Sequence, residues 1–469
     1  MLMIDLTREL ARLIVCTTPS AFSPEVRDRS SRILADSIGV MVGGARSEVF
    51  SPMQKYLAGT HGSVKVLGTD WQTTPAMAAL VQGTFGAALD FDDVFSVMPA
   101  HPSVLILAVG LVCAAARPVT WGELQEAHVL GLETGATMGR LMTLAHYNQG
   151  FHATGTLGVF AAVAAMGRLC GCDRGELQRA LGIAASMSAA LCRNFGTMCK
   201  PLHSGLAART AVDAVQLARC GLTAAPDALE GPAGFIEAYG AGPPGAIDLS
   251  DWGRQWAIAH PGPSLRKFAC YNANQRGMQG VLDLRTRLDL NASTLKRLIC
   301  RMPPGGMQGA IYPRPATGLE AKFSLPYVLA AGILDGRFGL DTFSDAAVRR
   351  TAIHGLLDRI EAYEDPSCRG DDPNFDRQTP GGRGFVEVEA WAMNGRHAKV
   401  RVHAPPGHPK NPLTWAELKD KFIDCVTYGG VQAEAAAAVF DQLERGEPPG
   451  DVQGFLAPFH PARPDNAGA

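Results

Sequence analysis

The segment GTLGVFAAVAAMGRL, residues 155–169, decides the fold class of this chain. Small and apolar residues occupy nearly every position, with the spacing of a helix and without the alternation of a strand. Small side chains allow neighbouring helices to pack closely. Segments of the same kind recur through the first half of the chain, at residues 27–42, 76–89, 173–188 and 205–220. This half therefore predicts an all-helical domain.

Beyond residue 261 the pattern changes. Residues 293–302 resemble a strand, and residues 384–402 resemble two strands joined around Asn394-Gly395, which is a strong hairpin signal. Helical stretches accompany them, at residues 276–288, 320–334 and 344–360. Helical spacing alone returns at residues 415–428, with Thr414 as the N-cap, and at residues 431–445.

The sequence thus predicts a mainly α protein, with a large all-helical domain and a smaller α+β lid domain. We expect the helical domain over residues 1–261, the lid over 262–404, C-terminal helices at 405–445 that rejoin the helical domain, and a loose tail at 446–469. The length of 469 residues agrees with two units, because a single core usually stops growing at ~250–300 residues.

Charge and composition argue against several classes of protein. The formal net charge is −2, and no basic block is dense enough to neutralise a run of phosphates or an anionic membrane surface. Asp5, Arg8 and Glu9 interrupt the N-terminal apolar residues, unlike a signal peptide. The longest apolar run, residues 104–116, is shorter than the ~18–20 residues that cross a bilayer. We expect a cytoplasmic protein that binds neither nucleic acid nor membrane.

The 11 cysteines are odd in number and scattered, which is typical of reduced thiols rather than of a disulfide framework. Only Cys170 and Cys172 are close in sequence, and their CGC spacing differs from that of zinc and iron–sulfur sites. The sequence therefore predicts no metal site.

Two segments of the helical half carry groups able to transfer protons. Asp90-Phe91-Asp92-Asp93 lies at the end of a predicted helix, where negative charges interact unfavourably with the helix dipole. The segment therefore has either a specific functional role or the structure of a solvated acidic turn. His101 follows after a short loop and lies either in a cleft or against a loop carbonyl. His152 precedes a helix whose dipole favours a neutral imidazole, and a buried structural histidine is the alternative.

Two further segments carry candidate cations. Residues 196–205 predict a non-helical loop, in which the apolar neighbours of Lys200 favour a substrate-binding or basic role over a snorkelling side chain at a helix start. Arg276 begins the second unit, where it either binds a carboxylate through two hydrogen bonds or forms a surface salt bridge.

These segments, together with AKFSLPY at residues 321–327 and Asn411-Pro412-Leu413, resemble the MmgE/PrpD family. The resemblance extends, in order and with family-like spacing, from about residue 6 to residue 445. It implies a large helical domain, a smaller α+β lid, a homodimer, no metal or organic cofactor, and an active site between the two domains.

The resemblance also implies proton transfer next to a carboxylate of a small di- or tricarboxylic acid. Such chemistry needs a cation aimed at the carboxylate and a base near the carbon acid. Lys200 and Arg276 fit the first role, and an imidazole oriented by Asp90 or Asp93 fits the second. The catalytic residues expected are Asp90, His101, Tyr147, His152 and Lys200, and the substrate-binding residues expected are Asp93, His203, Gln275, Arg276 and Tyr312.

Three functions follow, in this order. The leading one is a lyase, a dehydratase or decarboxylase of a polycarboxylate. A cofactor-independent epimerase or isomerase of a dicarboxylate comes second, because Tyr147 is similar to a tyrosine that the family's iminodisuccinate epimerases place opposite the lysine. A catalytically silent binding protein comes third, because Val94 and Gln275 stand where the decarboxylase pattern has threonine and histidine.

Overall fold

The computed structural model describes residues 5–242, 244–245, 248–371, 375–379, 381–446, 448 and 450–460. Contacts divide the chain into two compact units. Unit 1 comprises Met1–Arg193, Cys199–Pro263 and Thr414–Ala469, and unit 2 comprises Asn194–Met198 and Ser264–Leu413. The long segment of unit 2 thus runs from residue 264 to residue 413, whereas the domain boundaries predicted from the sequence are residues 262 and 404.

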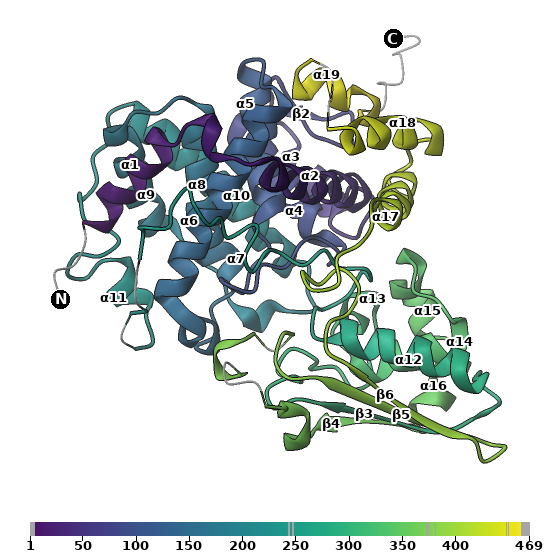
Figure 1. Cartoon of the computed structure of the whole chain (residues 1–469). Helices are drawn as coiled ribbons and strands as arrows, with labels where there is room; N and C mark the ends of the chain where they lie inside the picture. Colours follow the sequence, from purple (N-terminus) through teal and green to yellow (C-terminus); the bar gives the residue numbers. More distant parts are fainter. Residues whose placement is uncertain are drawn as a thin grey trace, which may run out of the picture. The chain divides into compact units, whose positions relative to one another are not determined.

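Unit 1 is built almost entirely of helices (Figure 1). They are α1 (Leu6–Cys16), α2 (Pro24–Gly44), α3 (Phe50–Leu57), α4 (Pro75–Ala88), α5 (Pro102–Ala116), α6 (Trp121–Asn148), α7 (Ala153–Thr156), α8 (Gly158–Leu169), α9 (Arg174–Met187), α10 (Cys199–Arg219), α11 (Phe235–Tyr239), α17 (Trp415–Tyr428), α18 (Ala433–Glu444) and α19 (Val452–Leu456). A short antiparallel pair, β1 (Val64–Lys65) and β2 (Gln72–Thr73), accompanies them. The predicted mainly α class is confirmed.

The core of unit 1 lies where α4, α5, α8 and α10 meet. Helix α4 packs against α2, α5 and α10, and α8 packs against α5, α6 and α10. Helix α5 is buried from Pro102 to Ala114, which explains its apolar sequence: a helix surrounded on all sides has no polar face.

Two glycines allow α4 and α10 to touch through their backbones. A Cβ atom added to Gly83 would lie 2.9 Å from the Cα atom of Gly205, and one added to Gly205 would lie 2.1 Å from the carbonyl oxygen of Leu80. Neither position has room for a side chain. The contact holds the end of α4 beside the beginning of α10.

Helix α17 brings the C-terminal part of the chain back onto α2. Thr414 caps it as predicted, through a reciprocal capping box with Glu417. Its buried Lys421 lies 2.6 Å from the Asp36 carboxylate of α2 and donates to the carbonyl oxygen of Phe91 at 2.7 Å. Because both charges are buried, this pair ties α17, α2 and the segment that follows α4 together.

Several expectations of unit 1 need correction. The tail at 446–469 is predicted to be loose, yet α19 lies within it and buries Val452, Phe455 and Leu456, since these apolar side chains supply a packing face. Residues 447, 449 and 461–469 lie outside the described residues. The predicted loop at 196–205 is also wrong from Cys199 onward. Helix α10 begins there, because Pro201 sits in its first turn, where a missing N–H costs nothing.

Unit 2 is an α+β structure with a sheet in the order β4-β3-β5-β6. Its strands are β3 (Leu295–Met302), β4 (Ile360–Glu364), β5 (Val386–Ala392) and β6 (His397–Val402), and its helices are α12 (Asn274–Leu288), α13 (Gly318–Ala321), α14 (Leu325–Asp335), α15 (Asp345–Val348) and α16 (Thr351–Leu357). Strands β3 and β4 are parallel, and the other neighbours are antiparallel. The predicted hairpin is confirmed as β5 and β6, with Gly395 at φ 85° in its turn.

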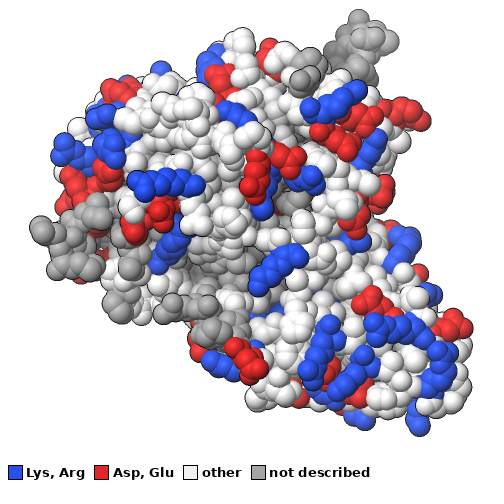
Figure 2. All heavy atoms as spheres, in the orientation of Figure 1, with Lys and Arg blue, Asp and Glu red and all other residues white. Residues whose placement is uncertain are grey.

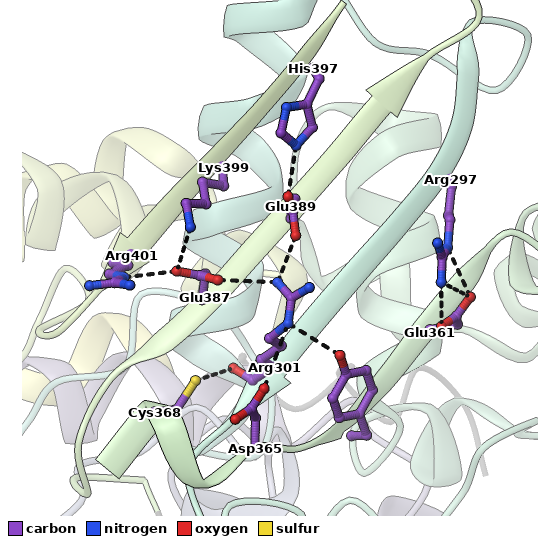
Figure 3. A network of polar contacts seen from close by, with 11 residues as sticks. Arg297, Arg301, Glu361, Asp365, Cys368, Glu387, Glu389, His397, Lys399 and Arg401 are labelled. Atoms are coloured by element: carbon purple, nitrogen blue, oxygen red, sulfur yellow. Dashed lines mark hydrogen bonds and ion pairs between the residues drawn. The ribbon is translucent and has the colours of Figure 1, made fainter. Parts of the chain in front are cut away.

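One face of this sheet is apolar and the other carries a polar network. Helix α12 packs against β5 and β6, and α14 against β4 (Figure 1). On the polar face, Arg301 of β3 lies 3.1 Å from Glu387 and 2.7 Å from Glu389, both on β5 (Figure 3). Alternation along the strands separates these two faces.

Acidic and basic side chains are interspersed over the visible surface (Figure 2), in agreement with the small net charge. Among the described residues, no helix combines the length and the apolarity required to cross a membrane.

Candidate functional site

Most of the predicted site residues lie in unit 1, around the end of α4 and the beginnings of α5, α7 and α10. Asp90 follows α4, and Lys200 is the second residue of α10. The Lys200 ammonium lies 2.6 Å from the Asp90 carboxylate, and the two side chains are only 7% and 5% exposed. The snorkelling interpretation of Lys200 is therefore wrong.

Each charge of the Lys200–Asp90 pair interacts unfavourably with the dipole of the helix beside it. An anion is unfavourable at the C-terminal end of α4, and a cation is unfavourable at the N-terminal end of α10. Asp90 also has a left-handed backbone, with φ 55°, which is rare for a residue other than glycine. Each charge compensates the other, and the strained, buried arrangement is typical of a functional site rather than of a helix cap.

His101 occupies the N-cap position of α5, and its Nδ1 atom lies 2.7 Å from the carbonyl oxygen of Asp93. A carbonyl only accepts, so Nδ1 carries the proton and the Nε2 atom of the neutral ring is left with its lone pair. The backbone N–H of His101 donates to the Thr154 hydroxyl at 3.2 Å. The sequence predicts that the carboxylate of Asp90 or Asp93 orients an imidazole, whereas Asp93 contacts His101 through its backbone carbonyl.

The Asp93 carboxyl group instead belongs to a buried chain of polar groups. Its oxygens accept from the backbone N–H and the hydroxyl of Ser103, at 3.2 and 2.8 Å. The Ser103 hydroxyl contacts Nε2 of His128 at 2.9 Å, and Nδ1 of His128 contacts the Ser30 hydroxyl at 2.9 Å. The chain therefore extends from the acidic segment through α5 and α6 to α2.

Burial decides the protonation of this chain. It raises the pKa of Asp93 to about 8, with the neighbouring Asp92 charge adding to the effect, and it lowers the pKa of His128 to about 3. When Asp93 is ionised, Ser103 donates to it and His128 donates to Ser103. When Asp93 is protonated, each of these hydrogen bonds reverses, and His128 donates to Ser30. The chain thus holds the acidic segment in place in both states, with the imidazole neutral throughout.

Two further histidines pair beside the ion pair. His152, the N-cap residue of α7, has its Nδ1 atom 2.9 Å from Nδ1 of His203 on α10. Burial and the nearby Lys200 charge lower the pKa of both, that of His203 to about 4. Two neutral rings that share one Nδ1 hydrogen bond have linked tautomers. If His152 donates this proton, its Nε2 atom is a base; if it accepts, Nε2–H is a proton donor.

The structure brings His101 and His152 close together, with ring centroids 6.1 Å apart. Tyr147 lies buried in the last turn of α6 rather than in a segment that opens a helix, and it contacts the thiol of Cys192. Unit 1 therefore assembles a buried cation, a histidine with a lone pair on Nε2 and a coupled histidine pair.

The three predicted residues of unit 2 are fixed by contacts inside that unit. The Gln275 amide accepts from the backbone N–H of Phe268 at 3.2 Å and donates to its carbonyl oxygen at 2.8 Å. Arg276 is buried, which lowers its pKa to about 10, and donates to the carbonyl oxygen of Arg383 at 2.7 Å. The Arg276 side chain is therefore not a surface salt bridge.

Tyr312, the third of these residues, is half-buried and donates from its hydroxyl to the Phe195 carbonyl oxygen at 3.4 Å. Since Gln275, Arg276 and Tyr312 all contact backbone groups, they brace segments of unit 2. Their role as substrate-binding residues stays a prediction.

Sequence reasoning missed His128, Ser103 and Lys421, which support the acidic segment from α5, α6 and α17. Helix α6, which carries His128, lies in the half predicted to be all-helical but is not one of the segments named there. A signal was available for Lys421: a lysine on the apolar side of the predicted helix 415–428 needs a buried partner, which proves to be Asp36.

Comparison with known proteins agrees with this arrangement of two units. The MmgE/PrpD N-terminal domain matches residues 8–247, and the MmgE/PrpD C-terminal domain matches residues 268–445. The chain belongs to the MmgE/PrpD family. Its division into a helical unit and an α+β unit follows the two family domains closely.

Three curated relatives of this MmgE/PrpD protein cover most of its length. It is 27% identical over 443 residues to cis-aconitate decarboxylase of Mus musculus, covering 90% of this chain and 87% of the relative. It is 27% identical over 439 residues to cis-aconitate decarboxylase of Homo sapiens, covering 90% and 88%. It is 24% identical over 449 residues to the cis-aconitate decarboxylase-like protein oryM of Aspergillus oryzae, covering 89% and 90%.

Proposed function

We propose that the protein is a lyase, a decarboxylase or dehydratase, that acts on a small di- or tricarboxylic acid by proton transfer next to a carboxylate. The observation that carries the proposal is the buried Lys200–Asp90 pair at 2.6 Å beside neutral histidines. Its relatives named cis-aconitate decarboxylase support the same class of reaction.

In this mechanism Lys200 binds a substrate carboxylate. An ammonium held in a buried site interacts strongly with an anion. As a C–H or C–C bond of the substrate breaks, negative charge develops next to that carboxylate. A cation placed beforehand stabilises this charge in the transition state.

His101 and His152 move the protons. The lone pair on Nε2 of His101 accepts a proton from carbon in a dehydration, and the coupled His152–His203 pair returns a proton to the leaving hydroxyl. In a decarboxylation the carboxylate leaves as carbon dioxide, and one of the imidazoles protonates the resulting carbanion.

The test incubates the full-length protein with cis-aconitate, with citrate-type hydroxy acids and with amino-dicarboxylates in deuterated buffer, and follows products by NMR. A lyase gives an alkene product or carbon dioxide, with deuterium at the carbon that was protonated. Deuterium in recovered substrate of inverted configuration, without any alkene, would contradict the lyase and support the second candidate.

That second candidate is an epimerase or isomerase of a dicarboxylate. Tyr147 favours it, because a buried tyrosine in the same region as the histidines offers a second proton carrier, as a two-base exchange requires.

A catalytically silent binding protein is the third candidate. Unchanged turnover and ligand affinity in both Lys200→Ala and His152→Ala would support it. We also propose a homodimer in the cytoplasm; sedimentation equilibrium tests the first and fractionation of the cells the second.

A further inference from the structure

Two cysteines meet at a place that the proposed reaction does not use. The Sγ atom of Cys113, near the end of α5, lies 3.6 Å from the Sγ atom of Cys170, the C-cap residue of α8. Cys113 is buried, whereas Cys170 is half-buried. Gly171 follows with φ 65°, and a Cβ atom added to it would meet no atom within 4 Å, so the turn after Cys170 borders open space. One thiol of the pair therefore belongs to a partly exposed residue and the other to a buried one.

The surroundings of the pair favour one thiolate. The Cys113 thiol, as hydrogen-bond donor, lowers the pKa of Cys170 to about 7, and Arg219 and Arg117 act in the same direction. The same contact raises the pKa of Cys113. The Arg117 guanidinium is fixed nearby, because it donates to the carbonyl oxygen of Leu169 at 2.8 Å. A half-exposed thiolate near cations is the usual setting of a reactive cysteine.

We propose that Cys170 and Cys113 form an oxidation site, at which a hydroperoxide converts the two thiols into a disulfide that joins α8 to α5. The Cys170 thiolate attacks the terminal peroxide oxygen: an S–O bond forms and the O–O bond breaks. The alkoxide or hydroxide leaves as an alcohol or water after it takes from the solvent the proton that the Cys170 thiol had released. Cys113 then attacks the sulfur of the resulting sulfenic acid. The S–S bond forms, the S–OH bond breaks, and water leaves with the Cys113 proton.

The electrons balance, since the two thiols supply the two electrons that reduce the peroxide. The movement required is small. The two sulfur atoms need to approach from 3.6 Å to the disulfide bond length of about 2.05 Å. Cys170 lies just beyond the last turn of α8, where the chain adjusts more easily than inside a helix.

The position of the pair separates this inference from the proposed reaction. His101 precedes α5 by one residue, and Cys113 follows 12 residues later, ~18 Å further along the helix. His152 likewise precedes α7 and α8, and Cys170 follows α8. The disulfide would therefore join the two helices at the ends opposite to the histidines. Its formation is measured by mass and does not depend on any activity.

The test treats the reduced full-length protein with a small excess of hydrogen peroxide, blocks the remaining thiols with iodoacetamide, and maps its peptides without reduction. We expect a linked peptide that contains Cys113 and Cys170, with a mass two hydrogens below the sum of the two peptides with free thiols. The rate is expected to rise as the pH is raised through about 7, as Cys170 ionises. Absence of this linked peptide, or a link between Cys170 and Cys172 in its place, would overturn the proposal.

Matched variants identify the role of each thiol. Cys172→Ser, two residues from Cys170, is expected to keep the disulfide, and Cys170→Ser to abolish it. Cys113→Ala is expected to accumulate a sulfenic acid on Cys170, trapped with dimedone. Should this buried substitution prevent folding, the wild-type protein and Cys172→Ser still decide between the linked pairs. Loss of the disulfide in Cys172→Ser would contradict the assignment.

Discussion

The imidazole of His101 is held by the backbone of Asp93, with Nδ1 2.7 Å from the carbonyl oxygen. This contact fixes the tautomer, and the Asp92 carboxylate lies further away, 4.0 Å from Nδ1. Asn at position 101 can donate to the same carbonyl through its side-chain amide, yet it has no basic nitrogen. We expect His101→Asn to keep its stability within about 1 kcal/mol and to lose activity by a factor of ~10²–10⁴, the usual contribution of an acid–base group.

The measurement compares kcat/KM of wild type and His101→Asn on the substrate found in deuterated buffer, with urea unfolding as the check of stability. Thr154→Val, which removes only the acceptor of the His101 N–H, serves as the control and is expected to lose far less activity. Retention of a third or more of the activity in His101→Asn would show that His101 is not the base.

The Lys200–Asp90 pair predicts strong coupling in a double-mutant cycle. Lys200→Met leaves the Asp90 carboxylate buried beside the C-terminal end of α4, and we expect it to lose about 3–5 kcal/mol of unfolding free energy together with its activity. Asp90→Asn is expected to behave similarly. The double variant should be more stable than the sum of the two losses predicts, because no unpaired charge remains. Urea unfolding checks this, and additive losses would contradict the buried pair.

Asp93 predicts an unusual dependence of stability on pH. Its pKa in the folded protein is about 8, well above its ordinary value near 4, so the folded state holds a proton that the unfolded state has released. Stability from this group is present at low pH and is lost as the pH rises through about 8. Between about pH 4 and pH 7, where the unfolded carboxylate is ionised and the folded one is protonated, the slope contributed by Asp93 approaches about −1.4 kcal/mol per pH unit, and it fades to zero as the pH passes 8.

Asp93→Asn tests this slope, because its amide mimics the protonated carboxyl group and satisfies Ser103 in the reversed direction of the chain. We expect the variant to lack the part of the fall in unfolding free energy that Asp93 contributes between about pH 4 and pH 8. Parallel curves for wild type and variant would mean that Asp93 is ionised in the folded protein at neutral pH.

The polar face of the sheet in unit 2 offers a matched comparison on one strand (Figure 3). Arg301 is 19% exposed and lies between Glu387 and Glu389, whereas Arg297 and its partner Glu361 are both about half exposed. We expect Arg301→Met to cost about 1–3 kcal/mol, since it removes charged hydrogen bonds from shielded carboxylates. Arg297→Met is expected to cost less than ~1 kcal/mol. Equal losses in urea unfolding would contradict this difference in shielding.

The sequence was sufficient to predict elements whose signals are local. Thr414 with Glu417 marks the start of α17, and Asn394-Gly395 marks the turn between β5 and β6, because capping boxes and tight turns depend on residues close in the chain. Lys200 shows the limit of such signals. Its neighbours indicate burial, but the loop predicted over residues 196–205 is a helix from Cys199 onward, with Pro201 in the first turn of α10.

The buried polar residues that hold the candidate site in place could not be predicted from short sequence patterns. Ser30, Ser103 and His128 come from three helices, and a polar residue on a helix has the same sequence pattern whether it faces solvent or another buried polar group. The backbone contact of Asp93 with His101 is likewise independent of the aspartate side chain. Resemblance to a family gave the site residues, and only the structure gave their partners.

The contact between Gly83 of α4 and Gly205 of α10 influences the distance between the charges of the Lys200–Asp90 pair. Gly83 lies seven residues before Asp90, and Gly205 lies five residues after Lys200. The distance between the two helices at this contact therefore helps to set the distance between the two charges. A single methyl group at either glycine would spread the helices and lengthen a salt bridge that it never touches. Evolution or an engineer could thus alter the spacing of the charges without changing any residue that bears one.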